Sequence, residues 1–502
     1  MGLNTLDLGV IAFYLAGVTL FGLRFRSRSR TLKGYFLADK SIPWWAISLS
    51  IVAAETSTLT IISVPGLAYD KDFRFLQLVL GYLLGRILVS FLFIPQYFRG
   101  ELVTAYQLID RRFGKRLHLL VAGIFLATRA AAEGVRVFAV AIVIRAALGS
   151  ILAAWISGIG DLGLDICAIG IVTLLTLVYT FEGGFSAVIW TDVVQLSIYI
   201  AGTLTAVFTL LHLIPGGWPA IHTIAASADK FRLFDLSFSL TDTYTLWSGL
   251  IGGAFLTAAS HGTDQLIVQR LLAARSQRQS QAALLTSGLV IFIQFSLFLL
   301  IGAMLYAFYR LNPPASPITR TDTLFPAFIV TRMNHGIAGL LIAAILAAAM
   351  SNLSAALNSL SSTTIVDFYS RLCPQSSEAQ RIRLSRATTI FWALALFALA
   401  ILSRNGGKVI ENGLAIASIA YGGLLGVFLL GVLTKKASER GAMVGFAIGF
   451  AVNLYLRFGT SIAFTWYVAI GSLVTFITGY FASFILPANT AITPSEVTQC
   501  SN

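Results

Sequence analysis

The chain has 502 residues, of which 57% are hydrophobic and only 11% are charged, and its mean hydropathy is positive. This composition excludes a water-soluble globule with a polar surface and places the chain in lipid. The net charge of +13 does not indicate nucleic-acid binding, because the basic residues lie in separate clusters between apolar segments.

Apolar segments follow one another along the chain and predict an all-α membrane protein with about 13 spans. The predicted spans are residues 5–23, 43–66, 75–98, 117–147, 162–181, 187–212, 244–262, 282–309, 337–366, 387–403, 409–433, 441–456 and 463–486. The first segment has no basic leader and no small-residue cleavage site, so we expect it to be retained. The polar tail, residues 488–502, is predicted to be disordered.

The loops between these spans carry an uneven positive charge. When the loops are assigned alternately to two faces, 21 of the 35 Lys and Arg residues fall on one face. The positive-inside rule makes that face cytoplasmic and puts the N-terminus outside and the C-terminus inside a cell membrane. The longest loops, 213–243 and 310–336, then lie outside, where they serve either as a lid or as simple connections.

The second span contains a polar run, AAETSTLT, at residues 53–60. An unpaired carbonyl is costly in hydrocarbon, so irregular backbone at membrane depth is found where it lines a site. One interpretation is therefore a break in the helix, and the other is Ser and Thr bonding to the preceding turn. Glu55 favours the break, because a carboxylate at this depth needs a partner, a proton or an ion.

A second polar patch lies in the ninth span, where Ser351, Ser354 and Asn358 are spaced to share one helical face. Close packing through small residues is one explanation of this patch. Oxygen ligands for sodium are the other. The three cysteines, Cys167, Cys373 and Cys500, are too widely and irregularly spaced for a disulfide framework or a zinc motif.

At these residues the chain resembles the sodium:solute symporter family, and the resemblance extends from about residue 34 to 445. The order and spacing of several separate segments together make the resemblance specific. These segments are 63–69 (SVPGLAY), 182–195 (EGGFSAVIWTDVVQ), 263–270 (TDQLIVQR), 351–359 (SNLSAALNS) and 426–431 (GVFLLG).

The resemblance implies a LeuT-like inverted repeat of five plus five helices within one transporter domain, residues 1–487. The repeats would be 43–212 and 244–433, with one extra span, 5–23, in front and two spans, 441–486, behind. The second and seventh predicted spans would be the two broken helices. No cofactor is implied, and sodium is the coupling ion.

The resemblance also implies ligands for that sodium. The family's main site maps to the carbonyls of Ala53 and Thr56 and to oxygens of Ala348 and Ser351. A hydroxyl is usual at the next position, where this chain has Asn352. Some members bind a second sodium at positions that map here to Asp192, Ser351, Ser354 and Ala355. Because the alanine departs from that pattern, we expect one sodium, with Asp192 either in the ion pathway or anchoring a helix end.

The solute is expected at midplane between the two broken helices, where half-helix ends offer oriented dipoles. We expect the second broken helix to open near Gly252 and Gly253. The residues then predicted to face the solute are Thr257, Ser260 and His261, together with Thr60 and Gln294 from neighbouring spans. His261 has an alternative explanation as a hydrogen-bonded core residue.

Three arginines within spans add to this site. Arg129, Glu133 and Arg136 share a helical face, and a carboxylate solute could be clamped by one of the guanidinium groups. The competing explanation, which we favour, is internal neutralisation of Arg129 or Arg136 by Glu133 and of Arg86 by Glu55. Sugars also stay open, because residues 263–270 resemble the family's sugar-carrying branch.

The sequence thus favours a secondary transporter that couples sodium entry to uptake of a small organic solute. A proton-coupled transporter of the same fold and a non-transporting membrane sensor are the alternatives. An enzyme is not expected, because no nucleophile with its base, no metal-ligand cluster and no phosphate loop is found. The sequence gives neither the solute nor the oligomeric state.

Overall fold

A computed structural model describes residues 3–24, 32–99, 102–155, 160–313, 320–405 and 409–486, and the predicted tail, 488–502, lies outside them. In this part of the chain the regular structure is helical, without strands. The α-helices are α1 (Thr5–Arg24), α2 (Leu32–Leu37), α3 (Trp44–Glu55), α4 (Thr58–Asp70), α5 (Phe75–Leu92), α6 (Ile94–Phe98), α7 (Tyr106–Phe113), α8 (Lys115–Trp155), α9 (Asp161–Leu213), α10 (Gly217–Ser227), α11 (Gly253–Gly262), α12 (Gln265–Leu272), α13 (Gln277–Leu311), α14 (Leu324–Arg332), α15 (Ile337–Thr363), α16 (Ser370–Leu372), α17 (Glu378–Leu402), α18 (Val409–Leu433), α19 (Glu439–Gly459) and α20 (Tyr467–Ile485).

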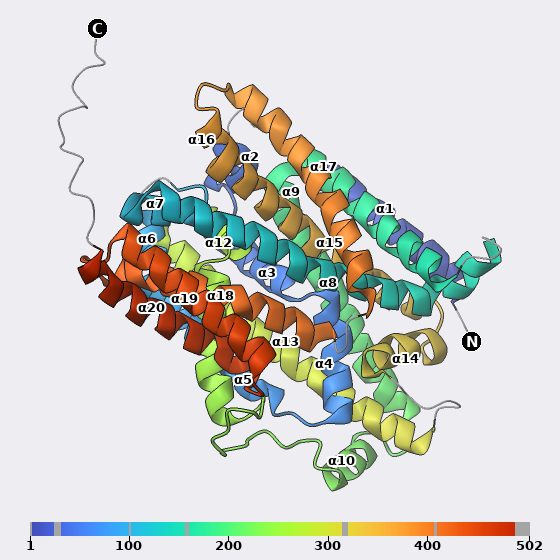
Figure 1. Cartoon of the computed structure of the whole chain (residues 1–502). Coiled ribbons are helices and arrows are strands. Elements are labelled where there is room, and N and C mark those ends of the chain that lie inside the picture. Colours follow the sequence, from blue (N-terminus) through green and yellow to red (C-terminus); the bar gives the residue numbers. More distant parts are fainter. Residues whose placement is uncertain are drawn as a thin grey trace.

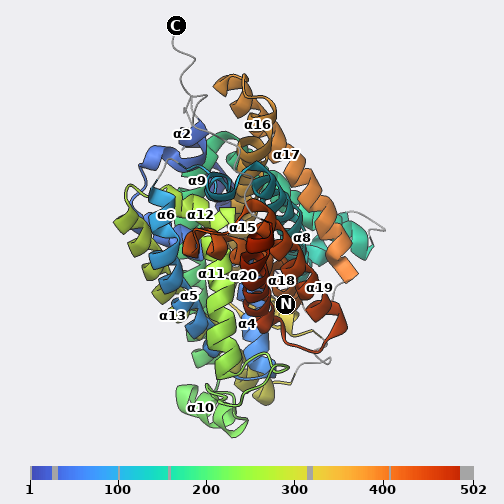
Figure 2. The ribbon, with the colours of Figure 1, turned by 60° about the vertical axis from the view of Figure 1, so that its left-hand side comes forward.

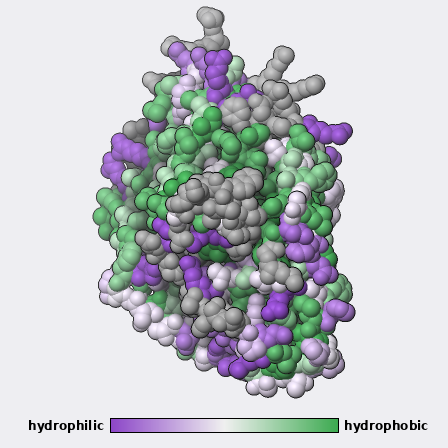
Figure 3. Space-filling view, turned by 90° about the vertical axis from the view of Figure 1, so that its right-hand side faces the viewer, coloured by the Kyte–Doolittle hydropathy of each residue, from purple (hydrophilic) through white to green (hydrophobic). Residues whose placement is uncertain are grey.

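The helices form one elongated bundle (Figures 1 and 2). Among the described residues nine helices are long and apolar enough to cross a membrane, or ten when one bent pair is counted as a single span. Hydrophobic side chains are spread over much of the outer surface, as Figure 3 shows for one face. An apolar exterior of this kind is expected for a bundle surrounded by lipid.

Local sequence signals define where several helices begin. Ser276, Ser377 and Ser438 each precede a helix and accept a hydrogen bond from a backbone N–H of its first turn. Side-chain capping of this kind satisfies amide groups that have no partner within the helix.

Helix α9 covers both the fifth and the sixth predicted spans, with helical backbone throughout. Its two halves nevertheless run in opposite directions, so the chain reverses at a bend within α9. Asp165 contacts Arg404 just beyond the end of α17, while Gly202 packs on Leu341 near the start of α15. Those two points lie at one end of the bundle, since α15 and α17 are antiparallel: Ser361 of α15 bonds to the carbonyl of Ser385 of α17.

The break predicted in the second span is confirmed. Helix α3 ends at Glu55, helix α4 begins at Thr58, and the two helices are inclined by 63°. Thr56 and Ser57 between them have extended backbones.

The break predicted near Gly252 and Gly253 is wrong in position. The chain there stays helical, as a π-helical turn (Ser248–Gly252) that continues into α11. Helix α11 ends at Gly262, and the interruption falls at Thr263 and Asp264, before α12. The glycines serve packing instead: a Cβ on Gly253 would lie 2.5 Å from the carbonyl oxygen of Leu78. Small residues of this kind let α5 and α11 approach closely.

Loops assigned to the same face contact one another. On the predicted outer face, Lys230 bonds to three carbonyls at the end of α4 and Ser239 accepts from Trp466. On the other face, Arg371 pairs with Asp110. In both views α2 and α16 lie at the upper end of the bundle and α10 at the lower end (Figures 1 and 2).

Helix α15 lies inside the bundle, and its residues from Leu341 to Thr363 are all buried. It packs on α9, α1, α8 and α3. The polar patch predicted in the ninth span is therefore enclosed by protein and does not face lipid.

Candidate functional site

The interruption between α3 and α4 leaves carbonyl groups at the end of α3 without the usual helical partners. The N–H of Thr56 still bonds to the carbonyl of Val52, but Ser57 makes no corresponding bond to Ala53 among the described residues. The carboxyl end of a helix also carries partial negative charge. The end of α3 is therefore suited to a cation.

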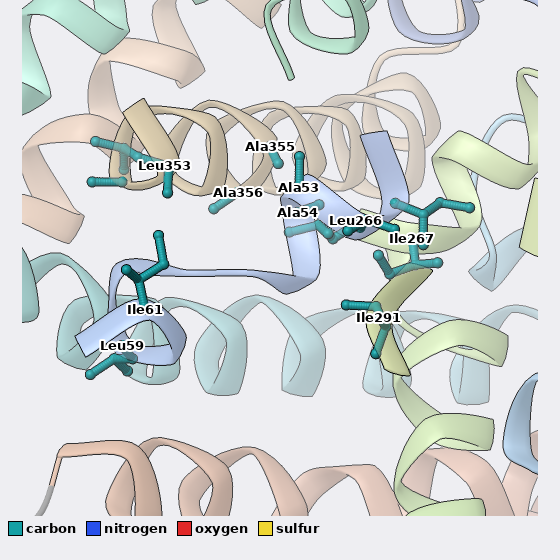
Figure 4. Close-up of a cluster of buried hydrophobic side chains, with 14 of the residues drawn as sticks. Ala53, Ala54, Leu59, Ile61, Leu266, Ile267, Ile291, Leu353, Ala355 and Ala356 are labelled. Carbon is teal, nitrogen blue, oxygen red and sulfur yellow. The ribbon is translucent and has the colours of Figure 1, made fainter. Parts of the chain in front are cut away.

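Helix α15 presents its polar side chains to this break. The amide Nδ2 of Asn352 donates to the carbonyl of Ala54 at 2.8 Å, and the Thr58 hydroxyl lies 3.4 Å from the carbonyl of Ile345. Figure 4 shows Ala53, at the end of α3, beside Ala355 of α15, and the extended link that leads on to α4. The two segments are thus adjacent although about 300 residues separate them in sequence.

A buried carboxylate adjoins the same face of α15. Asp192 of α9 accepts hydrogen bonds from Ser351 and Ser50, each at 2.5 Å, and pairs with Arg270 at 2.8 Å. Ser354 lies one turn further along and donates to the carbonyl of Ser351 at 2.9 Å. The charge of Asp192 is thus balanced by a guanidinium supplied from α12.

A cavity opens between the two interrupted helices. It holds about 900 Å³ of space, counting the part open to solvent. Its wall combines polar, charged and apolar side chains from α3, α4, α5, α8, α11, α12, α13 and α18. A half-enclosed space of this size and mixed lining is typical of a small-molecule site.

Of the residues predicted at the solute site, seven line this cavity: Glu55, Thr60, Arg129, Arg136, Thr257, Ser260 and His261. Arg86, Glu133 and Gln294 are not among its lining residues. Gln294 lies behind the break, where its Nε2 donates to the Thr56 hydroxyl at 2.6 Å.

One wall of the cavity carries a chain of ion pairs that crosses between helices. Arg129 of α8 contacts Glu133 at 3.0 Å and Asp264 at 3.2 Å, and the Tyr421 hydroxyl donates to Asp264 at 2.5 Å. Asp264 also caps α12 by accepting from the N–H of Leu266. The backbone at the second interruption is therefore fixed both by the ion pair of Asp264 with Arg129 and by the capping hydrogen bond from Leu266.

A second group of charges lies at the first interruption. Glu55 pairs with Arg86, which is buried and also donates to Ser287 and to the carbonyl of Tyr82. The Nε2 atom of His261 lies 3.5 Å from the Glu55 carboxylate. The internal neutralisation expected from the sequence is present in both groups.

Arg136 differs from the other two arginines. Its side chain is 22% exposed, against 6% for Arg129 and 1% for Arg86. Its contacts are longer, 3.6 Å to Glu133 and 3.4 Å to Asn352. Since it lines the cavity and also reaches Asn352 beside the break, it joins the two parts of the site.

Sequence reasoning missed several residues of this site. Asp264 lies in the matched segment 263–270, and an acid inside an apolar helix was a usable signal. Tyr421 and the aromatic wall formed by Phe75, Tyr82 and Phe295 had no such signal, because aromatic residues in membrane helices usually pack in the core or face lipid.

Comparison with known proteins gives consistent results. The model of a family described as "Sodium:solute symporter family" matches residues 35–449. The chain is 30% identical over 483 residues to a sodium/sialic acid symporter of Proteus mirabilis, covering 94% of each chain. It is 25% identical to the human sodium/iodide cotransporter, covering 92% of this chain and 70% of that protein.

A solved structure of a Na⁺-coupled sialic acid symporter, in a substrate-bound outward-open state, is also similar. It superposes with a TM-score of 0.84 at 30% identity, and the match covers 96% of this chain and 98% of that one.

Proposed function

Because the chain belongs to the sodium:solute symporter family, we propose that it takes up a small organic acid together with sodium by alternating access. Members of this family are multi-pass membrane transporters and not enzymes, and sodium is their coupling ion.

Sodium is proposed to bind at the end of α3. Its ligands would be the carbonyls of Ala53, Thr56 and Ala348, the Ser351 hydroxyl and the Asn352 amide oxygen. The observation that carries this assignment is the interruption at residues 56–57, which faces the polar side of α15. Carbonyl and hydroxyl oxygens at a helix break are how transporters of this architecture hold sodium.

One sodium is proposed per cycle. The positions that a second ion would need are Asp192, Ser351, Ser354 and Ala355, and the alanine brings no hydroxyl. Asp192 is in addition paired with Arg270 at 2.8 Å, so a fixed cation already balances its charge. A second sodium would have to displace that guanidinium.

The solute is proposed to be an anion whose carboxylate contacts Arg136. Arg136 is the most exposed of the three arginines and its contacts to Glu133 and Asn352 are long. Arg129, by contrast, is held between two carboxylates. The relatives named above are described as carrying sialic acid and iodide, which are both anions.

The remainder of the cavity supports a solute with both polar and apolar parts. Thr60, Thr257 and Ser260 offer hydroxyl groups, while Phe75 and Phe295 offer an aromatic surface. A hydroxylated organic acid matches this combination.

The topology is proposed to comprise thirteen spans, with the N-terminus outside and the C-terminus inside. Residues 43–212 and 244–433 would form the two repeats, preceded by the span 5–23 and followed by residues 441–486. The concentration of basic residues on one face supports this orientation.

The test is solute uptake into proteoliposomes that contain the purified chain. A panel of organic acids, sugars, amino acids and polyols is first screened by thermal shift with and without sodium. We expect an organic acid to stabilise the protein more strongly with sodium and to be accumulated only under an inward sodium gradient. Uptake that is unchanged when choline replaces sodium at fixed pH would reject the coupling, and stabilisation by neutral sugars alone would reject the proposed solute class.

A further inference from the structure

A groove separate from the cavity lies between α6, α7 and α18, near the end of the bundle where Figure 1 places α6 and α7. It shares no lining residue with the cavity. The residues that line it are Gln96, Leu108, Ile109, Arg111, Arg112, Phe428, Gly431 and Val432.

Arg112 is a cation without an acidic partner among the described residues. It donates to the carbonyl of Thr434 at 3.0 Å and lies over the ring of Phe113, whose centroid is 4.8 Å away. Burial lowers the pKa of this guanidinium below its usual range. The nearest acid in sequence, Asp110, is already paired with Arg371. A partly buried guanidinium with no acid beside it is stabilised by an anion.

The floor of the groove is apolar. Phe428 and Ile109 are fully buried beneath it, while Leu108 and Val432 remain partly exposed. Gly431 lies close to α7: a Cβ there would lie 3.1 Å from the Phe113 ring, a tight contact, and 3.5 Å from the Cγ of Arg112, an ordinary one. The groove therefore has arginines that can bind an anionic group and an apolar floor that can contact hydrocarbon.

We propose that this groove binds an anionic phospholipid, with its phosphate held by Arg111 and Arg112 and its upper acyl carbons lying on Leu108 and Val432. Arginine pairs with phosphate in a bidentate fashion, and basic pockets between membrane helices are suited to anionic head groups. The position supports a lipid over a free phosphate, since the groove is bounded by the last turn of α18 and by α6, which directly continues the spanning helix α5. The inference is independent of the proposed solute.

A competing role for Arg112 is to cap the end of α18 through the Thr434 carbonyl. The two roles predict different results. Loss of a cap lowers stability equally in all lipids, whereas loss of a lipid site removes only the extra stability that an anionic lipid provides.

The test measures thermal unfolding of the purified full chain in detergent during titration with short-chain phosphatidylglycerol, short-chain phosphatidylcholine or inorganic phosphate. Phosphatidylglycerol is expected to raise the unfolding midpoint of the native chain, and the other two are not. Arg111→Gln combined with Arg112→Gln is expected to require about tenfold more phosphatidylglycerol for the same shift. Arg383→Gln, which removes an exposed charge of α17 at the same end, is the matched control and should titrate like the native chain.

Two further variants keep the test decisive. Arg111→Gln alone removes an exposed side chain, so it answers the question even if the double variant folds poorly. Gly431→Leu keeps both arginines but fills the groove, and we expect it to lose the response as well. The proposal is overturned if phosphate reproduces the shift, if phosphatidylcholine matches phosphatidylglycerol, or if the arginine variants respond like the control.

Discussion

Around the cavity each buried charge has a counter-charge within the protein. Three arginines face three acids: Arg86, Arg129 and Arg136 against Glu55, Glu133 and Asp264. Because an isolated charge at membrane depth is costly, pairing of this kind is required before any solute binds. The proposed anionic solute would add a charge to this balanced site, and one sodium bound with it would restore neutrality.

Arg136 is the residue on which the solute proposal can be tested most directly. Arg136→Gln is expected to lower uptake of the organic acid at least tenfold, because the charge that meets the carboxylate is lost. Arg136→Lys keeps the charge without the planar fork and should retain part of the activity. Arg145→Gln, on the same helix and paired with Asp165, is the control. The measurement is sodium-driven uptake, and a normal rate in Arg136→Gln would contradict the assignment.

Ser351 is the residue that distinguishes an ion ligand from a packing contact. Ser351→Ala removes one proposed sodium oxygen, and the sodium concentration needed for half-maximal uptake should rise about tenfold while the solute requirement changes less. Ser359→Ala serves as control, because Ser359 is equally buried on α15 but its hydroxyl bonds, within the described residues, only to the carbonyl of Ala356. Equal weakening of the sodium and solute dependences would favour a packing role for Ser351.

At the scale of the helix, the two interruptions arise from different local causes. The first follows a polar run, and its two extended residues leave carbonyls available for an ion. The second is set by Asp264, whose side chain caps α12 and thereby ends the preceding helix at Gly262. The glycine pair at 252–253 resembled a hinge in the sequence. In the structure these glycines lie at the junction of a π-helical turn and α11, and they pack against α5.

The carboxyl end of α4, on the face predicted to be outside, is tied to the loop that contains α10. Lys230 donates to the carbonyls of Tyr69, Asp70 and Lys71 at 2.6, 3.1 and 2.8 Å, at the carboxyl end of α4. A cation at that end stabilises both the carbonyls and the helix dipole. The loop is thus fixed to the second half of the broken helix, a contact that fits either of the two roles predicted for it, a lid or a simple connection.

Lys230→Met should loosen this connection while keeping most of the side-chain volume. Amide hydrogen exchange in residues 67–73 and 217–230 is expected to become about tenfold faster, because three hydrogen bonds to a charged group are lost. Arg232→Met is the control, since the Arg232 side chain is more exposed and its one polar contact in the described part of the chain is with Asp235 at 3.4 Å. Exchange rates that match those of the control would show that the loop is held by its aromatic contacts instead.

For the whole molecule, orientation is the property most directly open to measurement. Cys373 is exposed and lies in a segment predicted to be cytoplasmic, whereas Thr241 is exposed in a segment predicted to be outside. In a chain with Cys167→Ser and Cys500→Ser, an impermeant maleimide should label Cys373 only after cells are permeabilised. A second chain that also carries Cys373→Ser and Thr241→Cys should be labelled in intact cells. The reverse pattern would invert the proposed topology.

The sequence by itself determined that this is a helical membrane protein and where most of its helices lie, and it favoured the break in the second span that the structure confirms. These features depend on residues close together in the chain: long apolar runs, and a polar stretch with an acid that lipid does not tolerate. The pairing of Glu55 with Arg86 was also expected, because an unpaired buried charge is too costly to persist.

Tertiary structure alone decided which groups meet across the bundle. Arg270 reaches Asp192 from 78 residues away, and Asp264 joins Arg129 to Tyr421 although no local pattern connects them. Tertiary structure also decided the position of the second interruption, because the glycines at 252–253 pack on α5 and stay helical instead of breaking the helix there. The physical reason is that the lipid fixes only whether a side chain is apolar or paired, while the choice of partner depends on which helices pack together.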